Sequence, residues 1–215
     1  MKLTLYYAPV TCALVPHVTL LEAGAEFEVH ALNFSKGQHM SPEFLAVNPK
    51  HKVPALVIDG RPLTENVAIQ LWIARHFPTA QLLPSDSDEE IRAVSFMAWC
   101  ASTIHPAITP CAFPQWFCDV PGTEDSVRRL SYRRLVESLR IAERLLDGRH
   151  WFFGDFTAAD AYFFWCFRRA GQAGADLDGL KNCAAHFERM TQRASVQKTL
   201  AFEAKVIAEF AQRIG

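Results

Sequence analysis

The sequence predicts an α/β domain over residues 1–81 followed by an all-helical domain over residues 88–215. Strand and helix patterns alternate in the first range, whereas no strand pattern occurs in the second. Between them lies a polar, proline-containing segment, residues 81–86, which is typical of a linker. About half of the 215 residues are apolar, so each domain has enough apolar side chains for a core.

The first domain is predicted to contain a β-α-β unit, a β-hairpin and a closing helix. Gly24 ends the first helix, and the pair Asp59-Gly60 forms the hairpin turn. A short helix begins at Pro42, with Ser41 as its cap. The remaining elements are expected as strand 2–7, helix 12–23, strand 27–32, strand 53–58, strand 61–63 and helix 66–77.

The second domain is predicted to consist of helices alone. They are expected over residues 88–118, 124–147, 157–172, 178–193 and 196–213. The first of them carries Pro106, Pro110 and Pro114, so it must kink or end early.

Composition excludes several classes of protein. The net charge is −1, with 22 basic and 23 acidic residues, which gives no attraction to nucleic acid or to an anionic membrane. Apolar stretches are shorter than the roughly 20 residues of a membrane span. The N-terminus resembles a strand rather than a signal peptide, so a cytoplasmic location is expected. The six cysteines show no zinc spacing, and no metal site is expected.

Two segments of the first domain are suited to bind a ligand with its own backbone and charges. A cis peptide bond at Val53-Pro54 leaves the Val53 N–H and C=O free for a ligand backbone; the alternative is an ordinary trans proline at a strand start. Thr64-Glu65-Asn66 precedes a helix, where Glu65 can accept from an ammonium while helix N–H groups bind a carboxylate. The alternative is that Thr64 or Asn66 only caps the helix.

Two further segments carry reactive or cationic side chains. Thr11 and Cys12 lie at the expected start of the first helix, where a thiolate is stabilised by the helix dipole. The alternative is a buried, inert cysteine beside a capping threonine. His39, His51 and Lys52 lie in two polar loops, either as solvated charges or as a cationic rim for a terminal carboxylate.

Taken together, these segments resemble the glutathione-binding half of the cytosolic glutathione transferases. The resemblance rests on Tyr6-Tyr7-Ala8-Pro9, on N-P-x-x-x-V-P-x-L over residues 48–56 and on T-E-x-x-A-I over residues 64–69. It implies a thioredoxin-like first domain, an all-helical second domain and glutathione as co-substrate. In the second domain, Thr157 and Asp160 resemble the family's capping box, whose role is structural.

The resemblance also implies roles for individual residues. Val53, before a cis Pro54, pairs with the cysteinyl part of glutathione, while Glu65 and Asn66 bind its γ-glutamyl head. His39, His51 or Lys52 reaches the glycyl carboxylate.

The catalytic group is left open between two neighbours. Cys12 matches the cysteine of the bacterial beta class, and Thr11 lies near the serine of theta- and delta-like classes. His105 matches a beta-class histidine, although Pro106 replaces the usual lysine beside it.

The reaction implied is conjugation of glutathione to a hydrophobic electrophile by a homodimer. Thiol–disulfide exchange through Cys12 and a non-catalytic binding protein are the alternatives. The second-substrate pocket is expected near the apolar and aromatic residues Tyr7, Val10, Trp99, Thr103, Phe113 and Trp116.

Overall fold

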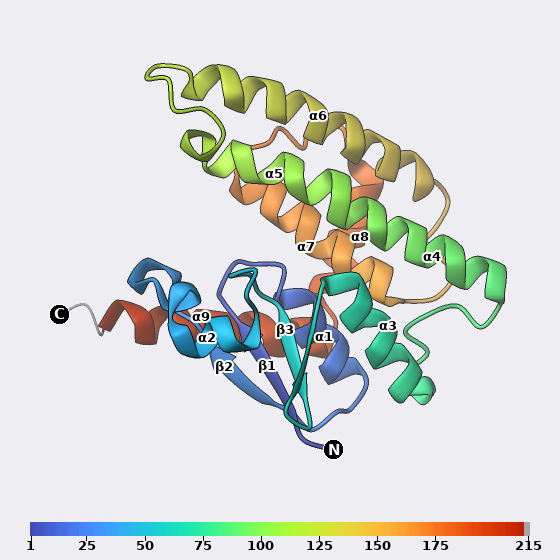
Figure 1. Cartoon of the computed structure of the whole chain (residues 1–215). Coiled ribbons are helices and arrows are strands. Elements are labelled where there is room, and N and C mark those ends of the chain that lie inside the picture. The colour runs from blue at the N-terminus through green and yellow to red at the C-terminus, as the bar shows by residue number, and fades with distance from the viewer. Residues whose placement is uncertain (213–215) are drawn as a thin grey trace. The chain divides into compact units, whose positions relative to one another are not determined.

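A computed structural model describes residues 1–212 of the chain, with the expected order of elements (Figure 1). The chain divides into two compact units, residues 1–82 with the segment from Gln192 onward, and residues 83–191. The first unit contains β1 (Leu3–Tyr7), α1 (Leu14–Glu22), β2 (Glu28–Ala31), α2 (Pro42–Val47), β3 (Ala55–Ile58), β4 (Arg61–Thr64), α3 (Asn66–His76) and α9 (Ala194–Gln212). No helix of the described part is long and apolar enough to cross a membrane.

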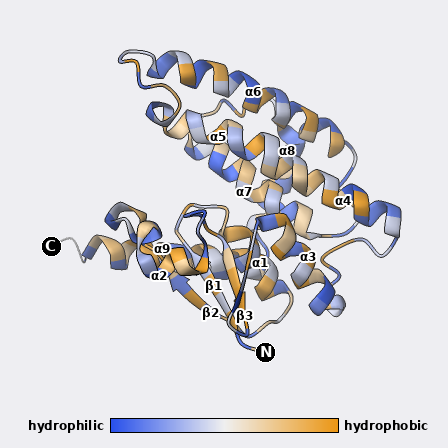
Figure 2. Ribbon diagram, in the orientation of Figure 1, coloured by the Kyte–Doolittle hydropathy of each residue, from blue (hydrophilic) through white to orange (hydrophobic). Residues whose placement is uncertain are grey.

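The sheet of the first unit has the strand order β2-β1-β3-β4. β1 pairs in parallel with β2 and antiparallel with β3, which pairs antiparallel with β4. In the register, Leu5 lies opposite Leu56, and both are fully buried. The β3 strand, Ala-Leu-Val-Ile, is coloured as hydrophobic in Figure 2. This is the βαβ-ββα order of a thioredoxin-like domain, as the sequence predicted.

Helix α9 departs from the predicted division, because the sequence placed it with the helical domain over 88–215. It packs on α1 instead, where His17 Nδ1 lies 2.8 Å from Thr199 Oγ1 and the His17 ring stacks on Phe202. Arg193, just before α9, pairs with Glu22 of α1 through two contacts of 2.8 Å. The apolar and aromatic side chains of the two helices therefore bury each other. Residue 213, where the sequence ended this helix, lies outside the described residues.

The long helix predicted over residues 88–118 is interrupted and shorter. It consists of α4 (Ser87–Trp99), a π-helical turn (Cys100–Ile104) and α5 (His105–Ala112). Pro106 lacks an N–H and cannot donate to the carbonyl four residues earlier. In the π-helical turn that precedes it, the His105 N–H donates to the Cys100 carbonyl, five residues back. The helix ends at Ala112 because Phe113 precedes Pro114 and adopts an extended φ of −133°.

The second unit is built around α7 (Ala158–Gln172), whose residues 158–167 are all buried. It contacts α4, α5 and α8 (Lys181–Thr191), and α6 (Glu124–Leu145) packs on α5 and α8. The predicted capping box is confirmed: Asp160 accepts from the Thr157 N–H at 2.8 Å and from the Thr157 hydroxyl at 3.0 Å. The buried His186 ring also bonds to Asp160, at 3.1 Å. Because Asp160 is wholly buried, this network fixes where α7 begins.

Candidate functional site

Thr11 forms a turn that leads into α1. Its hydroxyl donates to the Ala8 carbonyl at 2.7 Å and accepts from the Ala13 N–H at 3.3 Å. The side chain is half-buried. The hydroxyl proton of Thr11 is therefore donated within the loop.

Cys12 lies behind this turn and is 7% exposed. Its Sγ is 3.7 Å from the Val53 carbonyl oxygen, a long contact for a thiol donor. Burial raises the pKa of the Cys12 thiol to about 12, and a hydrogen bond from Asn66 opposes this effect only in part. The sequence left two interpretations open, a stabilised thiolate and a buried, inert cysteine, and the burial of Cys12 favours the second. Helix α1 begins only at Leu14, beyond Cys12, and desolvation has the largest effect on the pKa of the thiol.

The peptide bond at Val53-Pro54 is cis, as the ligand-binding interpretation of the sequence required. Val53 is 8% exposed and belongs to the core cluster that contains Tyr7, Ala13 and Phe44. Its carbonyl points to the Cys12 thiol. The backbone expected to pair with the cysteinyl part of a ligand thus lies directly beside the candidate nucleophile.

Glu65 occupies a strained position at the start of α3. It is the N-cap residue with a φ of 71°, in the left-handed region that non-glycine residues rarely adopt. Within residues 1–212, no side chain caps this helix, so neither Thr64 nor Asn66 plays the capping role that was the alternative. Three charged or polar groups meet here instead, since Lys50 Nζ pairs with the Glu65 carboxylate and donates to Thr64 Oγ1 at 2.7 Å.

The side chain of Asn66 is used inside the protein. Its amide donates to the Cys12 carbonyl at 2.9 Å, and its oxygen accepts from Gln70, which in turn accepts from Thr19. Asn66 therefore ties α3 to the start of α1. The sequence expected the amide to face a ligand carboxylate; in the structure, the first-turn N–H groups of α3 remain as the donors for that purpose.

The three cationic candidates occupy the neighbouring loops. His39 stacks on Phe34 with 4.4 Å between ring centroids, and His51 has a φ of 59°. The Nδ1 atoms of both rings are buried and have no partner among the described residues. Lys52 is exposed, and its charge favours the Cys12 thiolate, so it acts on the site electrostatically. Their convergence on one carboxylate stays a prediction.

Glu203 of α9 holds the loop before Thr11, and sequence reasoning missed it. Its carboxylate, on a side chain 2% exposed, accepts from the Tyr7 hydroxyl at 3.0 Å and from the Val10 N–H at 2.7 Å. Val10 has a φ of 68°, which is unfavourable for a β-branched residue. The sequence does contain a pattern that could have identified Glu203. It is the one acidic side chain in the series Val196, Thr199, Glu203, Val206, which has the spacing of one helix face and is buried in the structure.

Tyr7 and Val10 were predicted to line the second-substrate pocket. Tyr7 is 0% exposed, so it belongs to the core rather than to an open pocket wall. The alternation of β1 leaves Tyr6 half-buried on one face and points Tyr7 to the opposite face, where its hydroxyl donates to Glu203 of α9. Val10 is half-buried and lies at the open end of the same loop.

The other predicted residues lie in the second unit. His105 begins α5 and packs edge-on against Trp165, with ring centroids 4.4 Å apart. Phe113 and Trp116 stack on each other at 4.4 Å and are both exposed, and Thr103 lies exposed in the π-helical turn.

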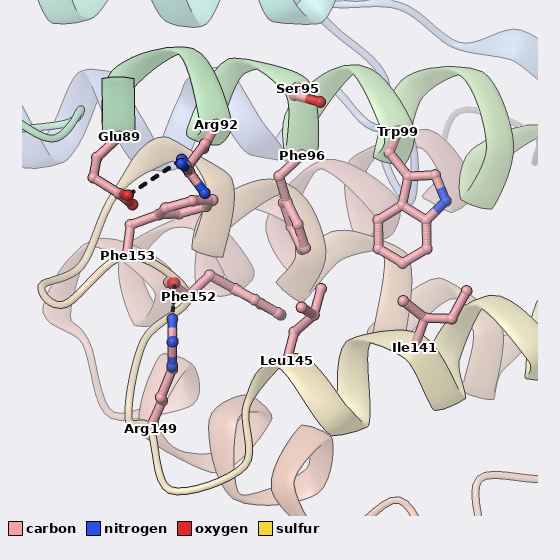
Figure 3. A pocket seen from close by; sticks show the side chains of 10 residues that line it. All are labelled: Glu89, Arg92, Ser95, Phe96, Trp99, Ile141, Leu145, Arg149, Phe152 and Phe153. Atoms are coloured by element: carbon pink, nitrogen blue, oxygen red, sulfur yellow. Dashed lines mark hydrogen bonds and ion pairs between the residues drawn. The ribbon is translucent and has the colours of Figure 1, made fainter. Parts of the chain in front are cut away.

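Trp99 lines a cavity of about 600 Å³ that is separate from these exposed residues. In Figure 3, Trp99 of α4 faces Ile141 of α6, while Phe96, Leu145 and Phe152 meet beside them. Thr103, Phe113 and Trp116 are not among the lining residues of this cavity. The part that these residues play in a second-substrate pocket stays a prediction.

No group of three potential metal-ligating side chains occurs among the described residues. The chemistry available to the site is that of a thiol, a hydroxyl, charged side chains and backbone amides. These groups suit binding of a small polar ligand that carries both charges.

Comparisons with known proteins agree with this arrangement. Residues 1–75 match the model of the glutathione S-transferase N-terminal domain, and residues 125–189 match that of the C-terminal domain. Glutathione S-transferase GstA of Escherichia coli O157:H7 is 34% identical over 203 residues, which cover 93% of this chain and 98% of the relative. The chain belongs to the glutathione S-transferase family. A transferase of Xanthomonas campestris, GST-4.5, is also 34% identical, over 93% of this chain and 98% of its own.

Solved structures of glutathione S-transferases have the same fold. The enzyme from Xylella fastidiosa has a TM-score of 0.89 at 28% identity, covering 94% of this chain and 98% of its own. A sphingomonad glutathione S-transferase in complex with glutathione has a TM-score of 0.83 at 31% identity, over 95% and 99% of the two chains. The predicted family and fold class are thereby confirmed.

Proposed function

We propose that the protein conjugates the thiolate of glutathione to hydrophobic electrophiles. One observation carries this proposal: groups from three parts of the first unit meet at Cys12. The Val53 carbonyl and the Asn66 amide contact it, and the charges of Glu65 and Lys52 act on its thiol. The relatives named glutathione S-transferase supply the reaction class.

Each part of glutathione has a partner in this proposal. The Val53 backbone pairs with the cysteinyl residue, and Glu65 accepts from the γ-glutamyl ammonium. His39, His51 or Lys52 binds the glycyl carboxylate. Asn66 acts by positioning Cys12 relative to α3 rather than by direct contact. The sulfur then lies near Thr11 and Cys12, where loop N–H groups and the Thr11 hydroxyl stabilise its charge.

The first test is binding of glutathione by calorimetry, followed by a conjugation assay with a generic aryl halide. Micromolar to millimolar binding with turnover supports the proposal. Binding without turnover in conjugation or disulfide exchange indicates a non-catalytic binding protein. Absence of glutathione binding overturns the proposal altogether.

Thiol–disulfide exchange through Cys12 is a second candidate function. The contact between Cys12 Sγ and the Val53 carbonyl favours it, because that backbone is where the cysteinyl part of glutathione is expected. The raised pKa of Cys12 opposes it, since exchange needs a thiolate. Incubation with glutathione disulfide followed by peptide mass mapping decides: a mixed disulfide located on Cys12 supports exchange, and one confined to the partly exposed Cys118 does not.

The remaining parts of the proposal concern assembly and the electrophile. We propose a homodimer, which is typical of glutathione S-transferases and is also the commonest homo-oligomer. A cytoplasmic location and a role in detoxification are proposed from the reaction class. Light scattering should give twice the chain mass of 24.2 kDa, and a value near 24.2 kDa counts against the dimer. The exposed Phe113 and Trp116 are proposed to contact the electrophile, with His105 in a supporting role.

A further inference from the structure

Lys50 is a cationic side chain at the site that neither the motifs nor the proposed function uses. Its ammonium pairs with the Glu65 carboxylate and donates to the Thr64 hydroxyl at 2.7 Å. A positive and a negative charge therefore lie side by side at the uncapped N-terminus of α3.

The backbone that carries Lys50 is held in place by a buried side chain. Asn48, 1% exposed, accepts from the Lys50 N–H at 3.1 Å and donates to the Lys52 carbonyl at 2.6 Å. The buried Asn48 thus holds the backbone of the turn from which the Lys50 side chain reaches Glu65. Glu65 itself is held at a φ of 71°.

Stability does not explain this pair. The side chains of Lys50 and Glu65 are 47% and 72% exposed, and exposed ion pairs contribute little to stability. The positive φ of Glu65 is unfavourable for a non-glycine residue, so the arrangement as a whole does not favour folding. Such strain is typical of residues that are held ready for a ligand.

We propose that Lys50 binds the α-carboxylate of the γ-glutamyl group while Glu65 accepts from its α-ammonium. This inference rests on the proposed function and extends it by one specificity-determining residue. The two ligand charges are attached to one carbon, so the site must present opposite charges close together, as Lys50 and Glu65 do. When the ligand binds, the Lys50 ammonium turns partly from Glu65 to the ligand carboxylate. The Glu65 carboxylate turns partly from Lys50 to the ligand ammonium.

The proposal defines a class of ligand. Lys50 and Glu65 together select thiol peptides that begin with a free α-amino acid head group, and they reject peptides that lack either charge. The first-turn N–H groups of α3 provide the remaining donors to the same carboxylate. The alternative role on the same geometry is that Lys50 competes with the ligand ammonium for Glu65.

Calorimetry with two ligands and three variants distinguishes these roles. The ligands are glutathione and its analogue in which hydrogen replaces the γ-glutamyl α-carboxylate. Lys50→Met should weaken glutathione binding about tenfold and change analogue binding by less than about twofold. Lys50→Arg should restore much of the affinity for glutathione, because it restores the charge. Lys205→Met removes an exposed lysine of α9 that pairs with Glu209, and it should change neither affinity.

Two outcomes overturn the inference while leaving the proposed function intact. Tighter glutathione binding by Lys50→Met means that Lys50 competes with the ligand. An equal effect of Lys50→Met on both ligands, including no effect on either, means that Lys50 does not bind the α-carboxylate. If the unmodified protein fails to bind glutathione, the proposed function falls first and this inference falls with it.

Discussion

The two ends of the proposed glutathione site differ in their state before a ligand arrives. The head-group side, made of Lys50, Thr64 and Glu65, is charged and exposed. The sulfur side, made of Thr11, Cys12 and Val53, is largely buried and its polar groups bond to one another. The difference supports the proposal that the charged head of glutathione is recognised first and that the reactive sulfur belongs to the ligand rather than to a thiolate of the protein.

The sharpest test of this comparison is the reactivity of Cys12 in the free protein. A pKa raised from 9.0 to about 12 lowers the thiolate population at neutral pH about a thousandfold. Alkylation followed by peptide mass mapping should therefore show Cys12 reacting about a thousandfold more slowly than an ordinary thiol, with the rate rising as pH increases.

Cys118 is the internal comparison for this experiment, because it is a partly exposed cysteine of the same chain. It should be modified long before Cys12. Modification of both at similar rates would mean that the sulfur side is open and ionised, and the contrast between the two sides would disappear.

A second test concerns the support beneath the sulfur side. His17 is buried between α1 and α9, and burial lowers its pKa from 6.5 to about 4. The unfolded chain therefore takes up the proton at a higher pH than the folded one, so the free energy of unfolding falls as pH decreases from 6.5 to 4. The expected loss is about 3 kcal/mol over this window.

Urea unfolding at several pH values measures this loss. The pH dependence that His17→Gln removes, relative to the unmodified protein, is the contribution of this ring. His76→Gln, which changes an exposed histidine of α3, should leave the dependence unaltered. A His17→Gln variant with the full acid sensitivity would show that the α1–α9 contact does not depend on a neutral imidazole.

Removal of the negative charge on the head-group side should have the next largest effect. Glu65→Ala takes away the partner of the ligand ammonium, and we expect a loss of about 2 kcal/mol or more in glutathione affinity. Glu65→Gln, which keeps the shape, should lose most of the same affinity, because the charge provides the interaction. Unchanged affinity of Glu65→Ala in calorimetry would show that the ligand head lies elsewhere.

Glu203 tests whether the loop before Thr11 depends on α9. Glu203→Ala removes the charged acceptor of the Tyr7 hydroxyl and the Val10 N–H, and should lower the free energy of unfolding by about 2 kcal/mol. Glu203→Gln keeps an acceptor oxygen and should lose less. A variant Glu203→Ala that unfolds at the same denaturant concentration as the unmodified protein would contradict this role.

Local sequence patterns predicted the first unit well because its elements are set by nearby residues. Gly24 and the Asp59-Gly60 turn end their elements where expected, and the Val53-Pro54 motif carries a cis bond. The place of α9 was not predictable in this way. Its amphipathic pattern predicts that one face is buried but does not show which element covers that face. In the structure α1 covers it, through the contacts of His17 with Thr199 and of Glu22 with Arg193.

The candidate site was predicted in its residue types but not in its protonation or hydrogen bonding. The motif T-E-N located Glu65 and Asn66, yet a motif does not show that the Asn66 amide turns inward to the Cys12 carbonyl. Lys50 lies within the recognised motif but was passed over, because its distance to Glu65 depends on how Asn48 folds the loop. The state of Cys12 depends on burial by distant residues, which local spacing does not reveal.

The smallest expected effect belongs to Thr11, and it separates the roles of the two neighbours on the sulfur side. The Thr11 hydroxyl donates to the Ala8 carbonyl, so it must turn away from that bond before it can donate to a glutathione thiolate. The net gain is then that of one ordinary hydrogen bond. Thr11→Ala should slow conjugation only about fivefold and slightly raise the pKa of bound glutathione, followed by thiolate absorbance.

Thr11→Ser retains the hydroxyl and should conjugate at nearly the unmodified rate, which distinguishes the donor from the methyl group. Cys12→Ala should remove any glutathione adduct that peptide mass mapping finds at position 12, yet spare much of the conjugation rate, because a neutral buried thiol is a poor nucleophile. A silent Thr11→Ala together with a Cys12→Ala variant that no longer conjugates would reverse the assignment. Cys12 would then have to ionise when glutathione binds, and the sulfur side, like the head-group side, would bind the ligand with a charged group of the protein.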